Sequence, residues 1–182
     1  MIIDFGAGPW PKPDATVRVD INRWPTTDVV HDLSVVPYPF DSDVADKVYM
    51  GDVIEHLSKF ILTDVLGEVY RILKPGGVLD ITTPDIEWIA ERIYKKDWAQ
   101  MANVDWLNRN NDPFEDAMEV IYAGWVNEKD HKIPGMGHIN GFNKEKLEKY
   151  LSTAGFRTIM RVPDMRNPAP ARDSVLRILA YK

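Results

Sequence analysis

The chain has 182 residues, of which 45% are hydrophobic and 27% charged, a length and composition suited to one globular domain with its own core. Cysteine is absent, which excludes disulfide frameworks, thiolate zinc sites and cysteine nucleophiles. No apolar run approaches the roughly 20 residues of a transmembrane helix, and no charged start precedes an apolar signal core, so we expect a soluble, cytoplasmic protein without membrane contact.

The net charge of −6 is unevenly distributed. The first 56 residues hold ten acidic and four basic residues, whereas the remaining residues hold 18 of each. The acidic half could attract a cationic ligand, or it could simply form a solvated surface. No basic stripe is interleaved with aromatic residues, so we do not expect a nucleic-acid partner.

Short apolar runs predict the first strands of a parallel sheet. They cover residues 1–5, 17–21, 29–30 and 45–50, and each is bounded by Gly, Pro or Asp. Apolar and polar residues do not alternate within them, so we expect both faces of the sheet to be covered.

The next segment changes to a helical period. Ser58 should cap a helix whose apolar stripe consists of Leu62, Val65, Leu66, Val69 and Leu73. A Lys-Pro-Gly-Gly sequence at 74–77 ends this helix, and residues 78–82 read as another strand. Strand, helix and strand in this order predict a right-handed crossover in an α/β sheet.

Residues 96–142 interrupt the regular pattern and read as a variable lid or insertion within a single domain of residues 1–182. The helix that precedes them should point Ile86, Ile89, Ala90 and Ile93 inward. One helix within them should carry Phe114, Met118, Ile121, Tyr122 and Trp125. The tryptophans of this segment could pack in a core or stack on a flat acceptor.

The end of the chain is regular again. Asn143 should cap a helix with the stripe Leu147, Tyr150, Leu151 and Ala154, and Gly155 should end it. Residues 156–162 and 174–181 read as strands. The proline-rich loop 163–170 between them is too short for a crossover helix, so this pair should be antiparallel.

Glycines follow the first strand directly, at Gly6 and Gly8, and Asp20 ends the second. Glycines let a ligand approach the backbone closely, and a carboxylate at a strand end can accept both hydrogen bonds of a ribose diol. Because the carboxyl ends of adjacent parallel strands meet, these residues together predict a site for an adenosine-type ligand.

The connection between these strands indicates which adenosine ligand is bound. A dinucleotide rests its pyrophosphate on a helix N-terminus. Here only 11 residues separate Gly8 from Asp20, three of them are proline, and Trp10 stands at the third glycine position of the dinucleotide motif. S-adenosylmethionine has no phosphate, and its sulfonium cation suits the acidic half. An NAD-dependent oxidoreductase is therefore the disfavoured alternative.

Several motifs occur in a fixed order along the chain. They are Ile-Ile-Asp-Phe-Gly-Ala-Gly at 2–8, Val-Asp-Ile at 19–21, Val-His-Asp-Leu at 30–33, Pro-Tyr-Pro-Phe at 37–40, Val-Ile-Glu-His-Leu at 53–57, the segment 66–77 and the segment 147–156. As an ordered set they resemble class I S-adenosylmethionine-dependent methyltransferases, and in particular the small type-eleven methyltransferase domain.

The resemblance implies a doubly wound, Rossmann-like sheet of seven mostly parallel strands with an antiparallel last strand. It also implies cofactor contacts by position: Asp4 orients the glycine turn, Gly6, Ala7 and Gly8 line the methionine part, Asp20 binds the ribose, Ile21 and Leu33 flank the adenine, Asp32 takes its amino group, and Gly51 and Asp52 face the methionine amine or the reacting methyl group. Asp4 and Asp32 could instead cap turns, and Asp52 could cap the segment after it.

The family's helix after the glycine turn has no counterpart here, so the pocket could be shallower or completed by another subunit, in a monomer or a homodimer. The expected reaction is methyl transfer to the oxygen or nitrogen of a small molecule, with His138 as a general base. We assign His31 and His56 to structural roles and His131 to the surface, and name no metal ligand. A non-catalytic nucleoside-binding domain is the alternative.

Overall fold

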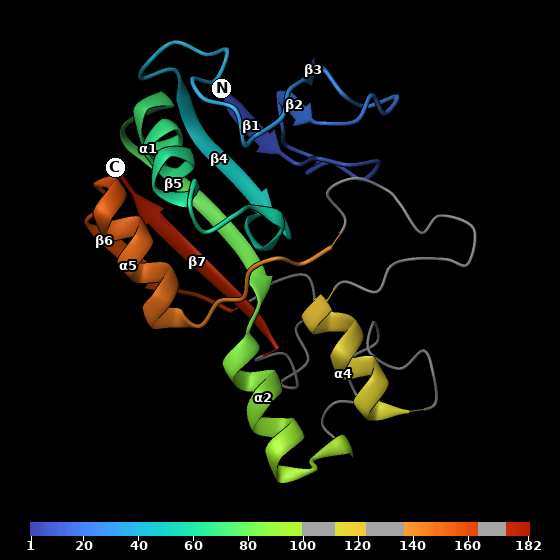
Figure 1. The fold of residues 1–182 in the computed structure, drawn as a ribbon. Coiled ribbons are helices and arrows are strands. Elements are labelled where there is room, and N and C mark those ends of the chain that lie inside the picture. The colour runs from blue at the N-terminus through green and yellow to red at the C-terminus, as the bar shows by residue number, and fades with distance from the viewer. Residues whose placement is uncertain (100–111, 123–136, 164–173) are drawn as a thin grey trace.

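The structure is a computed structural model that describes residues 1–99, 112–122, 137–163 and 174–182. Its seven strands form one sheet in the order β3-β2-β1-β4-β5-β7-β6 (Figure 1). The strands are β1 (Ile2–Phe5), β2 (Val17–Asp20), β3 (Val29–Val30), β4 (Ala45–Gly51), β5 (Leu73–Pro84), β6 (Thr158–Arg161) and β7 (Val175–Tyr181). The pairs from β3 to β5 are parallel, and β7 is antiparallel to both β5 and β6. The predicted Rossmann-like sheet is confirmed.

The helices α1 (Leu62–Ile72) and α5 (Lys144–Ala154) lie side by side on one face of the sheet (Figure 1). Their inward side chains are fully buried with alternate residues of the strands, for example Leu66 and Leu151 with Phe5, Met50 and Ile81. Burial of this apolar stripe is the main source of stability for both helices.

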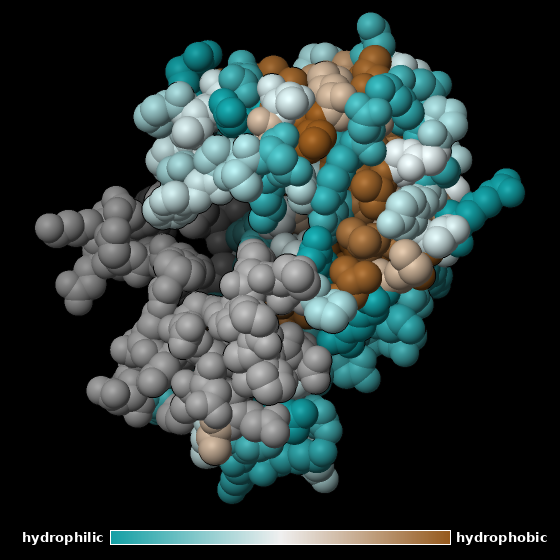
Figure 2. Space-filling view, turned by 180° about the vertical axis from the view of Figure 1, so that it is seen from behind, coloured by the Kyte–Doolittle hydropathy of each residue, from teal (hydrophilic) through white to brown (hydrophobic). Residues whose placement is uncertain are grey.

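The opposite face of the sheet carries charged and polar side chains among apolar ones. It carries Lys47 and Tyr49 of β4, Asp80 of β5 and Arg177 of β7. The Asp80 carboxylate accepts hydrogen bonds from Arg177 Nε at 2.9 Å and Nη2 at 2.8 Å, and Lys47 Nζ lies 3.0 Å from it. Figure 2, which views the molecule from behind, shows a hydrophobic stripe bordered by hydrophilic side chains.

Of the α-helices in the described residues, α1 and α5 cover the sheet, whereas α2 (Ile86–Lys95) and α4 (Pro113–Tyr122) pack on each other through Trp88, Ile89, Ala117 and Val120. Within the described residues, then, no α-helix covers the second face, and the expected cover of both faces is not confirmed there. Apolar side chains such as Ile2 and Leu179 share the partly exposed face with the charged ones and hide the alternation in the sequence.

Three local predictions are corrected. Ser58 is not the helix cap, because α1 begins after Ile61, and the Ser58 hydroxyl instead accepts the N–H of Phe60 in the preceding turn. In α2, Ala90 is exposed and Trp88 is buried, since the Asp85 cap places the helix start so that Trp88 faces α4.

In α4, Ala117 and Val120 face inward while Phe114 and Tyr122 are exposed. The small Ala117 lets α4 approach α2 closely, which the large side chains of the predicted stripe would prevent. Trp125 and Trp106 lie outside the described residues, whereas Trp98 packs against the α2–α4 cluster.

The last helix follows the sequence closely. The Asn143 side chain accepts the N–H of Lys146, and Gly155 ends α5 with φ of +111°. Both signals are local, so they could be read without knowledge of the fold. None of the described helices has the length and hydropathy of a membrane span.

Candidate active site

The carboxyl ends of β1 and β4 meet at the point where the sheet order changes direction. From β1 the chain continues to β2 on one side, while β4 lies on the other side. In open α/β sheets this reversal creates a crevice just beyond the strand ends, where ligands bind. The residues after β1, β2 and β4 are therefore the candidate ligand-binding residues.

The turn after β1 is built from two left-handed glycines. Gly6 has φ of +67° and Gly8 has φ of +57°, and the N–H groups of Gly6 and Ala7 donate to Val19 O at 2.8 and 3.1 Å. A Cβ at Gly6 would lie 2.4 Å from Val53 Cγ2, whereas a Cβ at Gly8 would meet nothing within 4 Å. Gly6 thus packs the turn against the segment after β4, while Gly8 keeps its outer side open.

Two carboxylates hold this turn. Asp4 Oδ2 accepts the N–H of Lys12 at 2.7 Å, and Asp20 accepts the N–H groups of Gly8 at 2.9 Å and Asn22 at 2.7 Å. Burial raises the pKa of Asp4 above its ordinary value, although the Lys12 N–H acts in the opposite direction. Each Asp20 oxygen has a second lone pair, so the carboxylate can still accept a hydroxyl.

The residues expected around an adenine differ in their exposure to solvent and in their contacts. Ile21 is 49% exposed at the end of β2, whereas Leu33 is 7% exposed and belongs to the main core. Asp32 Oδ1 accepts the N–H of Ser34 at 2.8 Å, which is a turn-capping contact. Their contacts to adenine stay predictions.

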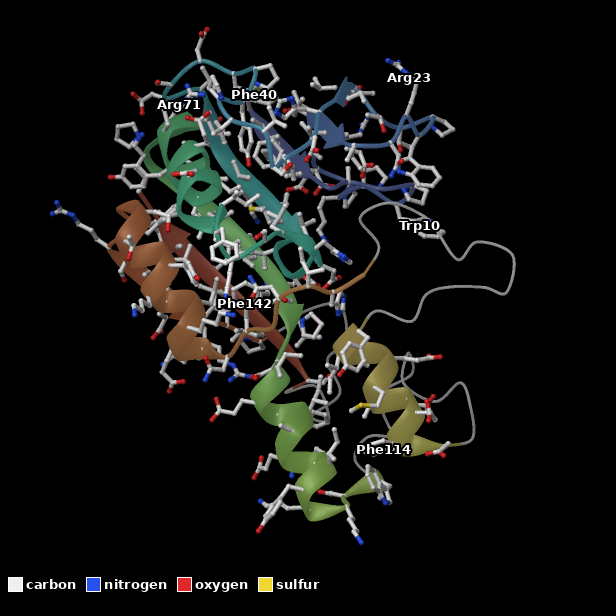
Figure 3. All side chains as sticks on the ribbon, viewed as in Figure 1. Trp10, Arg23, Phe40, Arg71, Phe114 and Phe142 are labelled. Carbon is white, nitrogen blue, oxygen red and sulfur yellow. The ribbon has the colours of Figure 1, made fainter. Side chains whose placement is uncertain are left out.

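A lysine that the sequence interpretation did not single out lies beside Gly51. Lys12 Nζ is 3.2 Å from the position that a Cβ would take at Gly51. Asp52, the next residue, is exposed, has φ of +56° and donates its N–H to Thr82 O. The sequence signal that could have identified Lys12 is its position as a basic residue between two prolines, just after the glycine turn. Trp10, from the same loop, points away from the sheet (Figure 3).

A second group of polar side chains joins two distant parts of the chain. The short 3₁₀ helix η1 (Ile54–His56) follows β4, and Glu55 O accepts the N–H groups of Ile139 and Asn140, both at 3.0 Å. Phe142, a core residue at the start of α5 (Figure 3), accepts the N–H of Ile86 through its carbonyl. These bonds hold residues 137–142 against η1 and the end of β5.

Both histidines of this region are oriented by backbone carbonyls. His56 Nδ1 lies 3.2 Å from Gly137 O, and His138 Nδ1 lies 2.7 Å from Val120 O in α4. A carbonyl can only accept, so Nδ1 carries the proton and Nε2 has the lone pair in each neutral ring. Burial lowers the pKa of both histidines, against a smaller opposite effect of the Asp52 carboxylate.

Glu55 completes the group. This residue is 1% exposed, and its Oε1 lies 3.8 Å from His138 Nε2. One donor atom from each of Glu55, His56 and His138 lies within 4.8 Å of the other two. The sequence interpretation named His138 alone. Glu55 was part of a family motif, and His56 was assigned to structure.

The other histidines are elsewhere. His31 Nε2 contacts Val35 O at 2.9 Å and its ring packs edge-on against Tyr38, in agreement with the structural role expected for it. His131 lies outside the described residues.

A protein-family model described as a methyltransferase domain matches residues 10–160. No curated protein sequence matches the chain.

Solved structures with the same fold include a SAM-dependent methyltransferase from Archaeoglobus fulgidus, with 15% identity and a TM-score of 0.59, covering 100% of this chain and 85% of that one. A possible histamine N-methyltransferase from Thermotoga maritima has 15% identity and a TM-score of 0.59, covering 100% and 81%. A 1,6-didemethyltoxoflavin-N1-methyltransferase from Burkholderia thailandensis, solved with its substrate and S-adenosylhomocysteine, has 13% identity and a TM-score of 0.55, covering 100% and 70%.

Proposed function

The chain belongs to the methyltransferase-domain family, and from this premise we propose that it transfers a methyl group from S-adenosylmethionine to an oxygen or nitrogen atom of a small molecule. The observation that carries the cofactor assignment is the glycine turn at the strand-order reversal, which is followed by a loop rather than a helix as far as β2.

This turn suits a nucleoside without a diphosphate. A pyrophosphate needs the N–H groups and positive end of a helix, and residues 9–16 form none. The open side of Gly8 leaves room for close approach to the backbone, and Asp20 supplies a carboxylate at the end of the next strand. These features fit S-adenosylmethionine and disfavour NAD.

Each part of the cofactor has a proposed contact. The methionine carboxylate is assigned to the Lys12 ammonium group, which lies beside Gly51. The methionine chain is assigned to Gly6, Ala7 and Gly8, whose turn Asp4 orients, and the ribose to Asp20. The adenine is assigned to Ile21, Asp32 and Leu33. The amine and the methyl group are assigned to Gly51 and Asp52.

When bound, S-adenosylmethionine supplies a methyl group on a positively charged sulfur. The acceptor's lone pair forms the new bond to the methyl carbon, and the electron pair of the broken carbon–sulfur bond stays on sulfur. Such a displacement depends chiefly on alignment. His138, neutral and with its Nε2 lone pair available, is the proposed general base for an acceptor that must lose a proton.

A small acceptor is proposed because the net charge is −6 and the sequence has no basic stripe for nucleic acid. Two proteins of the same fold are named for small nitrogen acceptors, histamine and 1,6-didemethyltoxoflavin. These names support a small acceptor. Which atom of the acceptor receives the methyl group, oxygen or nitrogen, remains part of the proposal.

Calorimetric titration with S-adenosylhomocysteine tests the cofactor assignment. Wild type should bind, Asp20→Ala should bind about tenfold more weakly or worse because hydrogen bonds to a charged group are lost, and Lys12→Met should also weaken binding. Asp28→Ala is the matched control, since Asp28 likewise accepts a backbone N–H, that of Arg18, but lies before β3 rather than after a strand. Thermal unfolding checks that all variants fold.

Tight binding that survives Asp20→Ala would refute the ribose contact. Saturation by NADH without any binding of S-adenosylhomocysteine would refute the proposed function.

A further inference from the structure

We propose that Glu55, His56 and His138 bind one divalent first-row transition-metal cation, and that this cation holds the hydroxyl oxygen of the methyl acceptor. The cation site itself is inferred from side-chain geometry. Its assignment to the acceptor rests on the proposed function.

The three donors match the ligands that such cations take in proteins. Two imidazole nitrogens and one carboxylate oxygen form the three-residue set of catalytic zinc sites and of open iron(II) sites. The chain contains no cysteine, so a site of this kind must use nitrogen and oxygen. Three protein ligands leave at least one coordination position for a substrate oxygen.

The protein already holds both imidazoles in the tautomer that a metal requires. His56 Nδ1 donates to Gly137 O and His138 Nδ1 donates to Val120 O, which fixes each ring and turns Nε2 away from the carbonyl. Histidines that bind metals almost always donate their other nitrogen in this way. Packing of the two rings alone would require neither an oriented Nδ1–H on each imidazole nor a carboxylate beside them.

The distances allow all three donors to reach one ion. A cation about 2.1 Å from each donor holds neighbouring donors about 3.4 Å apart. In the structure all three lie within 4.8 Å of one another, and His138 Nε2 is 3.8 Å from Glu55 Oε1. Small side-chain rotations close the remaining gap. A bound cation would also stabilise the negative charge of Glu55, which is 1% exposed.

The place of the cluster connects it to the reaction. Glu55 and His56 belong to η1, which follows Asp52 at the end of β4, and the Asp52 carboxylate is close enough to act on the charge of both imidazoles. A divalent cation lowers the pKa of a bound hydroxyl toward neutrality. With Nε2 bound to the cation, His138 no longer serves as the base, so the hydroxyl proton passes to solvent. The oxygen lone pair forms the O–CH₃ bond, and the carbon–sulfur pair remains on sulfur. The acceptor is then a hydroxyl compound rather than an amine.

The test uses the full chain after treatment with a chelator. Cobalt(II) is titrated while its visible d–d absorption is followed, and zinc is titrated by calorimetry. We expect saturation at one equivalent, and at least about tenfold weaker binding of both ions in His138→Gln and Glu55→Gln, because each removes one ligand. His31→Gln is the control, since it also removes an imidazole bonded to a backbone carbonyl, and it should bind as wild type does.

The same protein samples are titrated with S-adenosylhomocysteine, which separates the two proposals and shows that the variants are folded. Binding of the nucleoside without binding of cobalt or zinc overturns the cation site and leaves the proposed function intact. Cobalt or zinc binding without nucleoside binding keeps the cation site and overturns the proposed function. Unchanged metal affinity in His138→Gln and Glu55→Gln overturns the site, because the ion then has other ligands.

Discussion

The two halves of the sheet are stabilised in different ways. On one side, β1, β2 and β3 are joined by loops without helices. On the other side, α1 and α5 bury a continuous apolar layer against the sheet, a layer that also includes Phe5 of β1. The loops of the first half contribute Leu33 and Tyr38 to this layer. They are also held by aspartates that accept backbone N–H groups, namely Asp4 for Lys12, Asp20 for Gly8 and Asn22, Asp28 for Arg18 and Asp32 for Ser34.

This difference explains much of the acidic composition of the first 56 residues. A helix satisfies its own backbone N–H groups, whereas an irregular loop must find other acceptors for them. Short carboxylate side chains are good acceptors for such turns. The acidity therefore has a structural use, beyond the attraction of a cationic ligand and beyond solubility.

The largest expected effect lies in the helix-covered half. Leu66→Ala removes a fully buried side chain from α1 and should lower the free energy of unfolding by about 3 kcal/mol, through lost burial and a residual cavity. Val35→Ala, in an exposed loop position of the other half, should change it by less than about 0.5 kcal/mol. Denaturant unfolding measures both. Equal losses would mean that Val35 is packed as closely as Leu66.

A smaller effect is expected at the glycine turn, where backbone geometry replaces packing. Gly6→Ala should destabilise by about 2 kcal/mol, because it combines a left-handed φ with a Cβ 2.4 Å from Val53. Gly8→Ala has a similar φ but open space, so about 1 kcal/mol is expected. The same unfolding experiment compares the two. A cost at Gly8 as large as that at Gly6 would show that φ alone, rather than contact with Val53, determines the sequence of this turn.

The smallest of the three main effects, after those of Leu66→Ala and Gly6→Ala, concerns the ion pairs on the second face of the sheet. Burial alone would raise the pKa of Asp80, but hydrogen bonds from Arg177 and Lys47 outweigh it and hold the pKa below its ordinary value of 3.8. The stability from this lowered pKa is therefore present above pH 3.8 and is lost as the pH falls through the folded-state pKa.

Asp80→Asn should cost about 1.5 kcal/mol at pH 7, and the gap to wild type should narrow below pH 4. Urea unfolding at a series of pH values measures this gap. A gap that stays constant down to pH 2.5 would show that the carboxylate charge of Asp80 contributes nothing to stability. Asp46→Asn, at an ion pair with Lys74 in which the Asp46 side chain is 56% exposed, is the surface comparison.

The elements that the sequence predicts well are those whose signals are local. The stripe Leu62, Val65, Leu66 and Val69 identifies α1, although Leu73, the last residue expected in that stripe, begins β5. The Asn143 cap and the Gly155 stop identify α5. The seven mostly parallel strands and the antiparallel last strand followed from the family resemblance that the ordered motifs carry. The second face, which no helix of the described residues covers, was expected to be covered. Apolar residues on this face mask the alternation of apolar and polar residues in the sequence.

The Glu55 cluster could not be predicted for a different reason. His138 is separated from His56 by more than 80 residues, and nothing in either segment indicates that the other lies beside it. The orienting carbonyls of Gly137 and Val120 belong to the backbone, which every residue has and which leaves no trace in the sequence. Long-range juxtaposition and backbone acceptors are the two properties that residue types do not encode.

The bond from His138 to Val120 ties one histidine to α4, which lies within residues 96–142, the segment that the sequence predicts to be a variable lid. His138 also donates its backbone N–H to Tyr122, at the last residue of that helix. Replacement or displacement of α4 would thus re-aim this imidazole while the turn at Gly6 and the aspartate at the end of β2 stayed where they are. Under the proposed function, a change in α4 would therefore alter the acceptor side of the site and leave the proposed nucleoside contacts unchanged.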